Sequence, residues 1–588
     1  MPRAGRPVRD ADILPTAAEF DYRPGGLVYV RSPHVLGPYP LRITERLEYW
    51  AARAADRTFL ARRAASGAWD RLTYGQTLAR VRAIAQGLID RKLADGRPIA
   101  ILSGNSIDHA LLALAALYTG IPHASIAPAY SLATADFTTL RYVWQMLEPA
   151  LVFADLRAYD PALAAVAGNG TPVLRDCASL AAGRVTAAVD RAHAAVGPDT
   201  IAKILFTSGS TGHPKGVVIT QRMWCSNLEM IRSVLRFLAA EPPVLCDWLP
   251  WNHTFGGNHN FGIALYNGGT LYIDDGKPTP AQFPATLANL REIATTAYFN
   301  VPKGYEMLVR ALRADQALRR TFFSRLRLVF YAAAGLKQEV WDDLQDLACE
   351  TCGEEILMIT GLGATETAPA ALFTGREGAS AGRVGLPLPG VELKVVPLEN
   401  KMEARVRGPN VTPGFWRNPE LTRAAFDEEG FYRMGDAVRL ADPADPLRGF
   451  LFDGRLADDF KLSTGTWVNV ELVRTRFLTR FGDMVQDVAI AGPDRDYLTA
   501  LVFLAPSANR TRLQPLLDEL AAHSTGSSTR IVRMLLLDEP PSLDAREITG
   551  KGNLNQKAVL AHRADMVAEL YAPAPSPRVI EITGGNPQ

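Results

Sequence analysis

Two apolar runs enclose a loop of small residues between Lys203 and Thr220, and this stretch constrains the fold more than any other part of the chain. The runs are Ile204-Leu205-Phe206 and Val217-Val218-Ile219, and both contain the β-branched residues that favour buried strands. A flexible surface linker would not be bracketed by two apolar strands. The sequence therefore predicts a strand–loop–strand unit within a larger core.

The loop between these strands has the chemistry of a phosphate cradle. Glycines let backbone N–H groups turn toward an anion, and hydroxyl groups and a lysine supply further donors. The Walker-type P-loop is excluded, because Gly216 follows Lys215 where that motif needs Ser or Thr, and a strand follows instead of a helix. The predicted phosphate-binding residues are Thr207, Ser208, Gly209, Ser210, Thr211, Gly212 and Lys215.

The composition excludes several classes of protein. The chain has 588 residues, 47% of them hydrophobic, which suits a globular protein with three to four domain-sized units. Its 63 basic and 62 acidic side chains give no reason to expect a nucleic acid or a membrane as partner. No apolar run approaches the roughly 18 residues needed to span a bilayer, and no secretory signal is evident. Five cysteines make no disulfide framework, so we expect a cytoplasmic protein.

Helices and short strands alternate along the first third of the chain, which favours α/β layers with largely parallel strands. Residues 1–26 are expected to be an irregular extension, and the expected elements are a largely helical stretch over 41–93, strands over 99–102, 150–154 and 172–174, and a helix over 108–118. Beyond residue 370, glycine, proline and short β-branched runs indicate a β-rich subdomain.

Several motifs in a fixed order resemble one known family. The loop at 207–215 resembles that of the acyl-adenylate-forming (AMP-binding) superfamily, which includes acyl-CoA synthetases, peptide-synthetase adenylation domains and luciferases. The stretches CDWLPWNHTFGGNHNFGIALYNGGTLYIDDGKPTP and YFNVPKGYEML are more narrowly similar to bacterial feruloyl-CoA synthetases. The resemblance runs from about Leu27 to about Tyr571, nearly the whole chain.

The resemblance implies an α/β architecture of two domains. A large N-terminal domain over 27–455, built of layered α/β subdomains plus the β-rich subdomain, would bind ATP and an acid. A small mobile α+β domain over 456–588 would carry a catalytic lysine. Relatives usually place Asp or Lys two residues after the arginine that corresponds to Arg455. This chain has Ala457 there, so the hinge is either Ala457 or Asp458.

For the nucleotide, the resemblance implies that Thr365 contacts the α-phosphate and that Glu366 helps to hold Mg²⁺. A hard divalent cation that bridges phosphate oxygens usually takes only one or two protein carboxylates. Taken without the family, an acidic residue there would equally cap a helix N-terminus. Ala334 and Gly335 are implied to line the adenine, and Leu362 stands where many relatives stack an aromatic residue on that ring.

Three charged residues complete the implied catalytic set. Asp436 would bind both ribose hydroxyls, since a carboxylate accepts two hydroxyl bonds in parallel, and Arg455 would be a second ribose or phosphate contact. Lys551 would bridge the attacking carboxylate and the α-phosphate in the transition state, with Lys557 as its rival. Outside the family context each of these would be read as an ordinary surface charge.

The acid-binding residues implied by the resemblance lie in the two stretches quoted above. His253 matches a gate between the acyl pocket and the thiol tunnel, and Phe255 would line a slot for a flat aromatic acid. Two histidines six residues apart, His253 and His259, do not by themselves make a metal site. Further pocket candidates are Asn300, Lys303, Tyr305 and Ala333.

The sequence is therefore interpreted as an ATP-dependent acid–CoA ligase that acts on a hydroxycinnamate such as ferulate, 4-coumarate or caffeate, with ATP, Mg²⁺ and coenzyme A. Activation must keep a mixed anhydride from water until a thiol arrives. Two alternatives stay open: a ligase for another acid or for a separate carrier protein, and a non-catalytic nucleotide-binding protein. A homodimer is also left open.

Overall fold

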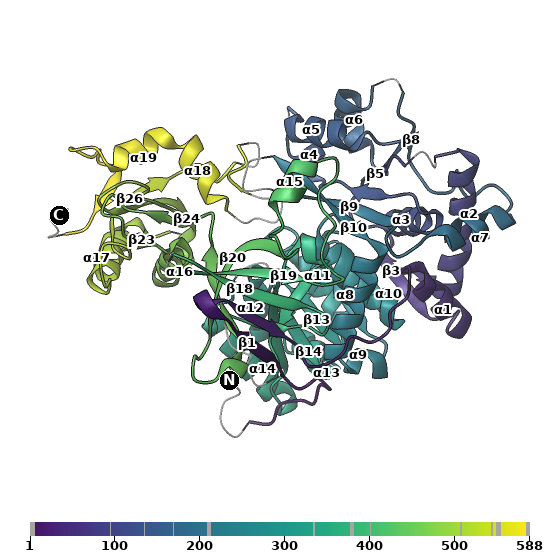
Figure 1. Ribbon diagram of the computed structural model, residues 1–588, viewed down its shortest axis with the longest axis horizontal. Coiled ribbons are helices and arrows are strands. Elements are labelled where there is room, and N and C mark those ends of the chain that lie inside the picture. The colour runs from purple at the N-terminus through teal and green to yellow at the C-terminus, as the bar shows by residue number, and fades with distance from the viewer. Residues whose placement is uncertain are drawn as a thin grey trace.

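The computed structural model describes residues 6–93, 96–134, 136–168, 170–208, 213–332, 335–376, 382–399, 401–505, 508–542, 545–548 and 554–583. Over these residues the fold is mixed α/β, which confirms the predicted class. A smaller C-terminal part lies at one end of the molecule, and α2 (Tyr74–Asp90) and α7 (Ala187–Ala195) lie at the other (Figure 1). Within the described ranges, no helix combines the length and apolar character that crossing a membrane requires.

The predicted strand–loop–strand unit forms the antiparallel edge of a sheet that has six strands among the described residues. In order across the sheet these are β10 (Pro214–Thr220), β9 (Ile201–Ser208), β6 (His123–Ser125), β5 (Ile99–Leu102), β7 (Leu151–Ala154) and β8 (Val173–Leu174). The other neighbours pair in parallel. Every residue of β5 and β7 is buried, as expected where helices cover both faces of a parallel sheet.

Helices in this part of the chain are α3 (Ile107–Thr119), α4 (Ala129–Leu132), α5 (Thr138–Leu147), α6 (Asp160–Val166) and α8 (Gln221–Val234).

Helix α3 shows why the local predictions succeed here. It begins after Ser106, whose side chain accepts a hydrogen bond from His109 N, and it ends at Gly120, whose φ of 75° suits glycine. The His109 ring is buried, with Nδ1 2.9 Å from Gly104 O and Nε2 2.8 Å from Ser125 Oγ. Burial lowers the pKa of His109 to about 4, so the ring is neutral inside the fold.

The stretch over 41–93, which was predicted to be largely helical, contains two strands as well as two helices. Helix α1 (Thr44–Arg53) and helix α2 are present, but β3 (Thr58–Arg63) and β4 (Trp69–Thr73) lie between them. These strands join β12 (Thr270–Ile273) and β11 (Val244–Asp247) in a second sheet of order β11-β12-β3-β4. The prediction failed because β3 is stabilised by parallel pairing with β12, a contact far along the chain that local periodicity does not report.

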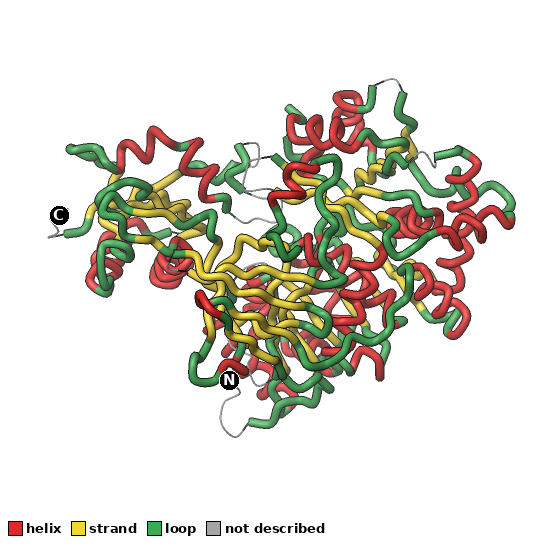
Figure 2. The backbone as a smooth tube through the Cα atoms, in the orientation of Figure 1, coloured by secondary structure: helices red, strands yellow, loops and turns green. Residues whose placement is uncertain are grey.

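The largest sheet, 11 strands over the described ranges, passes through the middle of the molecule (Figure 2). Its parallel end consists of β13 (Ala297–Asn300), β14 (Leu328–Tyr331) and β15 (Leu357–Gly363). The remaining strands are antiparallel and follow in the order β16 (Ala370–Phe373), β17 (Arg383–Pro387), β21 (Phe450–Arg455), β20 (Tyr432–Leu440), β19 (Lys401–Arg407), β18 (Glu392–Leu398), β2 (Val28–Arg31) and β1 (Glu19–Tyr22). The antiparallel strands β16 to β21 agree with the prediction of a β-rich subdomain beyond residue 370.

Strand β1 corrects the prediction that residues 1–26 form an irregular extension. Glu19–Tyr22 pairs with Val28–Arg31, which in turn pairs with β18. Val8 also bridges to Glu355. β1 pairs with the nearby β2, but β2 pairs with β18 and Val8 bridges to Glu355, and local sequence does not report these contacts hundreds of residues away. The other helices of the N-terminal part are α9 (Phe237–Ala240), α10 (Phe261–Asn267), α11 (Phe283–Glu292), α12 (Pro302–Ala314), α13 (Gln316–Ser324), α14 (Gln338–Cys352) and α15 (Pro419–Ala424).

The C-terminal part has a core of its own, with Phe477, Val488 and Val502 among its fully buried residues. Its sheet has the order β24 (Val485–Ala491), β25 (Leu498–Leu504), β26 (Ile531–Leu537) and β27 (Val579–Glu581), and a short pair joins β22 (Phe460–Lys461) to β23 (Trp467–Val468). The helices are α16 (Val470–Phe481), α17 (Leu513–Ala522), α18 (Gln556–His562) and α19 (Ala564–Leu570). The domain boundary at 455/456 stays a prediction.

Ion pairs connect the start of this C-terminal part to β19 and the turn before it. Lys401 and Asp459 form a buried pair, with side chains 6% and 4% exposed. Glu399 accepts from Lys461 Nζ at 2.9 Å and from Trp467 Nε1 at 2.6 Å. The predicted hinge residues Ala457 and Asp458 directly precede Asp459, so a pivot there would act beside these contacts.

A second buried ion pair holds the segment that leads to Lys551. Glu547 is fully buried, and its two carboxylate oxygens accept from Arg563 Nε at 2.7 Å and Arg563 Nη2 at 2.8 Å. Ser542 N donates at 2.7 Å and His562 Nδ1 lies at 2.9 Å. Together these donors hold the pKa of Glu547 at about 2 against the opposing effect of burial.

We predict that Glu547→Gln loosens this segment, because it leaves the Arg563 guanidinium buried without a counter-charge. Breaking a buried ion pair costs about 3–5 kcal/mol. Hydrogen exchange of α18 and β26, measured by mass spectrometry, should therefore become faster. The matched control is Glu539→Gln, which changes an exposed carboxylate nearby and should leave the exchange unchanged. Equal protection in both variants would contradict the assignment.

Candidate active site

The described residues of the phosphate loop lie on paired strands. In the β9–β10 register Thr207 is opposite Lys215, and Ser208 is opposite Pro214. Residues opposite each other in an antiparallel pair share a face, so the Thr207 hydroxyl and the Lys215 ammonium project to the same side. The Lys215 Nζ lies 5.8 Å from the centroid of the Phe415 ring. The other predicted members of the cradle, Gly209, Ser210, Thr211 and Gly212, lie outside the described residues.

Thr412 connects this hairpin to the turn that carries Glu366. The turn, η4 (Thr365–Thr367), follows β15. Thr412 N donates to Glu366 O at 2.8 Å, and Thr412 Oγ1 donates to Val218 O in β10 at 2.8 Å. Thr412 is 2% exposed. No local pattern singles out Thr412, since Pro413-Gly414 beside it is typical of an ordinary loop.

Asp436 and Arg455 are neighbours across the strands β20 and β21, where they are register partners. Arg455 Nε lies 3.8 Å from Asp436 Oδ1, and the two side chains are 69% and 13% exposed. Burial raises the pKa of Asp436 to about 6, Arg455 opposes the rise, and the Glu366 carboxylate adds to it. The Tyr432 hydroxyl also hydrogen-bonds with Glu366. Glu366, Tyr432 and Asp436 therefore form one acidic cluster beside the hairpin.

This cluster suits a hard divalent cation. Two carboxylates that raise each other's proton affinity favour a nearby positive charge, and their oxygens are the donors that Mg²⁺ prefers. The described residues contain no group of three or more His, Cys, Asp or Glu side chains arranged for a metal. Any cation at Glu366 would therefore take its remaining ligands from phosphate and water. The Thr365 side chain, 5% exposed, lies on the same turn.

Of the residues predicted around adenine, Leu362 lies in β15 and Gly335 follows β14. Leu362 is 8% exposed and packs in the main core. The space around Gly335 is open, because a Cβ there would meet no atom within 4 Å. Ala333 and Ala334 lie outside the described residues.

A π-helix, η3 (Phe255–Asn260), carries the histidine-rich motif. Phe261 N donates to Gly256 O, five residues back, and this wide turn leaves other carbonyls in need of donors. Two glycines allow it to form, since a Cβ at Gly256 would lie 2.3 Å from Leu249 O and a Cβ at Gly257 would lie 2.3 Å from Trp251 O. Such bulges are frequently found at functional sites.

Buried donors from two other elements hold this π-helix. Trp224 Nε1 in α8 donates to Asn258 O at 2.8 Å, and Lys203 Nζ in β9 donates to Gly257 O at 3.2 Å. Lys203 is 4% exposed, and its ammonium lies 3.6 Å from the centroid of the Trp224 ring. Burial lowers the pKa of Lys203 to about 7. Lys203 was not among the predicted site residues, although a lysine inside an apolar strand is a visible signal of a buried polar contact.

The two motif residues assigned to the acid pocket lie at the start of this π-helix. His253 is half-buried, and its Nδ1 accepts from Phe255 N at 3.2 Å. Phe255 is 5% exposed and contacts the Phe330 ring at a centroid distance of 5.9 Å. Their positions are compatible with the predicted gate and pocket wall, which stay predictions.

The other three pocket candidates have structural partners. Asn300 is fully buried, its Oδ1 accepts from Trp248 Nε1 at 3.2 Å, and its Nδ2 donates to Tyr298 Oη at 2.9 Å. The Tyr305 hydroxyl contacts Tyr298 O and Phe330 O, both at 2.9 Å, and so bonds with β13 and β14. Lys303 is 62% exposed and pairs with Glu306 three residues along α12. Contacts of these residues with an acid stay predictions.

Lys551 lies outside the described residues, but the base of its loop is described. Ile548 and Leu554 form an antiparallel bridge, and Asn555 N donates to Glu547 O at 2.8 Å. The two segments that flank the loop therefore lie side by side at its base, where the buried Glu547 is bonded to Arg563.

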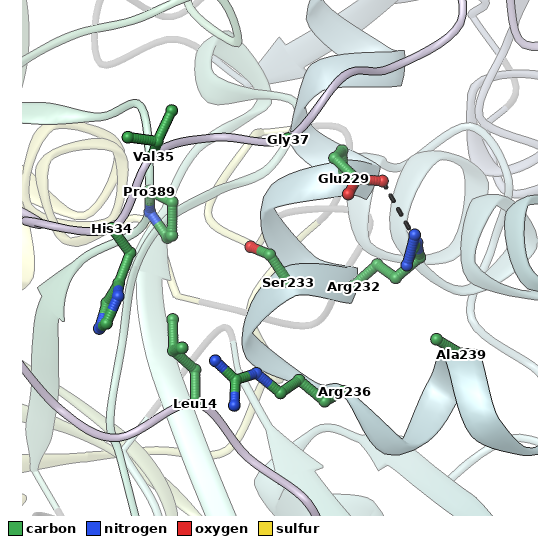
Figure 3. Close-up of a pocket in the computed structure, with 10 residues that line it drawn as sticks. All are labelled: Leu14, His34, Val35, Gly37, Glu229, Arg232, Ser233, Arg236, Ala239 and Pro389. Atoms are coloured by element: carbon green, nitrogen blue, oxygen red, sulfur yellow. Dashed lines mark hydrogen bonds and ion pairs between the residues drawn. The ribbon is translucent and has the colours of Figure 1, made fainter.

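A surface cavity lies away from these residues. It has a volume of about 380 Å³ and is formed by the N-terminal segment around His34–Gly37 and the end of α8, where Arg232 pairs with Glu229 (Figure 3). None of the residues predicted to bind nucleotide or acid lines it.

The chain is similar in sequence to known proteins. A family profile described as "AMP-binding enzyme" matches residues 47–416, which includes the hairpin, the π-helix and Glu366. A carboxylic acid reductase of Mycobacterium marinum is 25% identical over 86% of this chain, and an anthranilate–CoA ligase of Pseudomonas aeruginosa is 31% identical over 45% of it. The matched regions span 46% and 48% of those relatives, about half of their lengths.

The fold also resembles solved structures. A crystal structure of an anthranilate CoA ligase in complex with anthranoyl-AMP superposes with a TM-score of 0.72 at 18% identity, covering 90% of this chain and 99% of the other. At that identity the likeness establishes the fold alone. Because the family profile covers well over half of the chain, the protein belongs to the AMP-binding enzyme family.

Proposed function

We propose that the protein is an AMP-forming acid–CoA ligase whose acid is a hydroxycinnamate such as ferulate, 4-coumarate or caffeate. The observation that carries the proposal is the convergence of the Thr207/Lys215 pair with Glu366 and Asp436 through the bonds of Thr412 and Tyr432. Family membership and a relative named anthranilate–CoA ligase support it. The resemblance of residues 246–280 and 298–308 to feruloyl-CoA synthetases supports the choice of acid.

In the first half-reaction, the hairpin would hold the phosphates of ATP. Lys215 and the loop hydroxyls neutralise the pyrophosphate as it leaves, and Asp436 with Arg455 fixes the ribose. Mg²⁺ held by Glu366 would supply further charge neutralisation at the phosphates. An oxygen of the acid's carboxylate attacks the α-phosphorus, and Lys551 stabilises the charge that develops there. The products are the acyl-AMP and pyrophosphate.

In the second half-reaction, coenzyme A replaces AMP on the acyl carbon. Rotation of the C-terminal domain about Ala457 or Asp458 would withdraw Lys551 and open the path that His253 borders. The thiol sulfur then attacks the acyl carbon, the bond to the AMP oxygen breaks, and AMP leaves. One pocket thus serves two transition states in turn.

The choice of acid and thiol is tested by measuring thioester formation and ATP–pyrophosphate exchange. We expect a thioester with coenzyme A for hydroxycinnamates at a kcat/KM well above that for benzoic and fatty acids. Exchange without any coenzyme A thioester would show that the thiol acceptor is a separate carrier protein. Preference for a fatty or benzoic acid would reject the hydroxycinnamate assignment, and absence of both reactions would reject a ligase.

Lys551→Ala should abolish adenylation while ATP binding stays largely intact, because the lysine acts on charge that develops only in the transition state. Pyrophosphate exchange and ATP titration calorimetry measure the two effects separately. Lys557→Ala is the matched control and should retain exchange. If Lys551→Ala exchanges at a near-normal rate, or if Lys557→Ala is the inactive variant, the assignment of the lysine is wrong.

Asp436→Asn should weaken ATP binding and stabilise the free protein. In the folded protein burial raises the pKa of the Asp436 carboxyl to about 6, against 3.8 for an unperturbed aspartate, so above pH 6 its charge destabilises the fold. A pKa raised by about two units corresponds to a loss of about 3 kcal/mol in the free energy of unfolding. The uncharged side-chain amide of the Asn variant removes this loss. The gain in stability over the wild-type protein should shrink as the pH falls below about 6, because the Asp436 carboxylate of the wild type then becomes protonated and loses its charge.

Thermal unfolding between pH 5 and pH 8 and ATP titration check this pair of effects. The control, Asp445→Asn, replaces an exposed carboxylate and should change neither quantity. A destabilised Asp436→Asn variant at pH 7.5 would contradict the interpretation.

A further inference from the structure

His259, on the π-helix, is enclosed by four phenyl rings. Its ring centroid lies 5.0 Å from that of Phe299, 5.4 Å from Phe255, 5.4 Å from Phe330 and 6.5 Å from Phe373. We call these four residues the phenylalanine cage. The histidine is 1% exposed. A polar imidazole in such surroundings needs partners, because burying an unpaired polar group is costly.

Only one of the two ring nitrogens has a partner among the described residues. Nδ1 lies 2.8 Å from Asn260 Oδ1, whereas Nε2 is buried without any hydrogen bond within the described part of the chain. A carbonyl oxygen can only accept, so Nδ1 carries the proton. Burial lowers the pKa of His259 to about 4, and the ring is neutral at physiological pH. Nε2 therefore presents a lone pair and requires a hydrogen-bond donor.

The cage lies beside the segments assigned to the acid and the nucleotide. Phe299 and Phe330 are the residues before the last ones of the parallel strands β13 and β14, and ligands of open α/β sheets bind beyond the carboxyl ends of such strands. Phe373 is the register partner of Gly361 in β15, where a Cβ would lie 2.5 Å from the Phe373 ring. Phe255, the predicted pocket wall, forms the remaining side.

We propose that the phenylalanine cage receives the aromatic ring of the acid and that His259 Nε2 accepts a hydrogen bond from a hydroxyl group on that ring. This inference rests on the proposed function and adds the feature of the acid that is recognised. The site is specific for a donor: a phenol satisfies the lone pair, whereas a methoxy group in its place, a bare ring or an alkyl chain leaves it unpaired. Since the cage encloses His259, binding requires at least one phenyl ring to change rotamer.

The strength of the discrimination follows from the cost of an unpaired group. A ligand that leaves a buried acceptor unsatisfied should bind with roughly a 10- to 100-fold lower affinity. A site that hydrogen-bonds a substrate hydroxyl rejects the analogue that lacks it more strongly than an apolar pocket distinguishes one methylene group. A buried water on Nε2 is the competing explanation, and it would give no such preference.

The test compares kcat/KM for 4-coumarate, cinnamate and 4-methoxycinnamate, together with the binding of each acid measured by calorimetry. We expect the wild-type protein to prefer 4-coumarate over both analogues by about 10- to 100-fold. In His259→Phe the ratio of 4-coumarate to cinnamate should fall to within about threefold. His259→Gln, which keeps an acceptor oxygen, should retain part of the preference. The control His523→Phe makes the same change at an exposed histidine outside the cage and should preserve the ratio.

The outcomes separate this inference from the proposed function. If the aromatic acids are activated but 4-coumarate and cinnamate are used and bound equally, the inference is wrong and the ligase proposal stands. An unchanged ratio in His259→Phe would likewise overturn it. If no aromatic acid is bound or activated, both the inference about His259 and the proposed function are wrong. If thermal unfolding shows that His259→Phe does not fold, the inference is judged from the ratio of kcat/KM for 4-coumarate to that for cinnamate in His259→Gln and in the wild-type protein.

Discussion

The candidate site depends on hydrogen bonds from buried side chains to backbone carbonyls of other elements. Thr412 bonds with both β10 and the Glu366 turn, while Lys203 and Trp224 bond with the π-helix. Each of these bonds joins segments that are far apart in sequence. Breaking a bond of this kind would leave a buried carbonyl unsatisfied, so these bonds resist separation of the segments that they join.

The π-helix shows how such a site is built against local preference. A wide turn is rarely stable by itself, and here it exists because Gly256 and Gly257 approach neighbouring carbonyls too closely for any side chain. The charge of Lys203 in the core is compensated by the face of Trp224 and by Gly257 O. The result is a segment that places Phe255 against Phe330 and His259 against Phe299, near the ends of β14 and β13.

The sequence predicted what depends on local pattern and missed what depends on distant partners. Strands β5, β9 and β10 and helix α3 were predicted because apolar runs, caps and glycine stops lie within the segments themselves. Strands β1 and β3 were missed because the hairpins that they form with β2 and β4 are held in their sheets by β18 and β12, which lie far along the chain. Asp436 and Arg455 were named from motifs, but their pairing comes from the β20–β21 register. The satisfied hydroxyl of Tyr305 could not be foreseen either, since both of its acceptors are backbone atoms of other strands.

Lys203 has a consequence for how the two substrates act on each other. It lies on β9, the strand that ends at Thr207 and Ser208, and it contacts Gly257, the centre of the segment that carries Phe255 and His259. A shift of β9 on nucleotide binding would therefore change the position of the acid-facing side chains. Thermodynamic linkage makes any such effect reciprocal. If bound nucleotide raises the affinity for the acid by some factor, bound acid raises the affinity for nucleotide by the same factor.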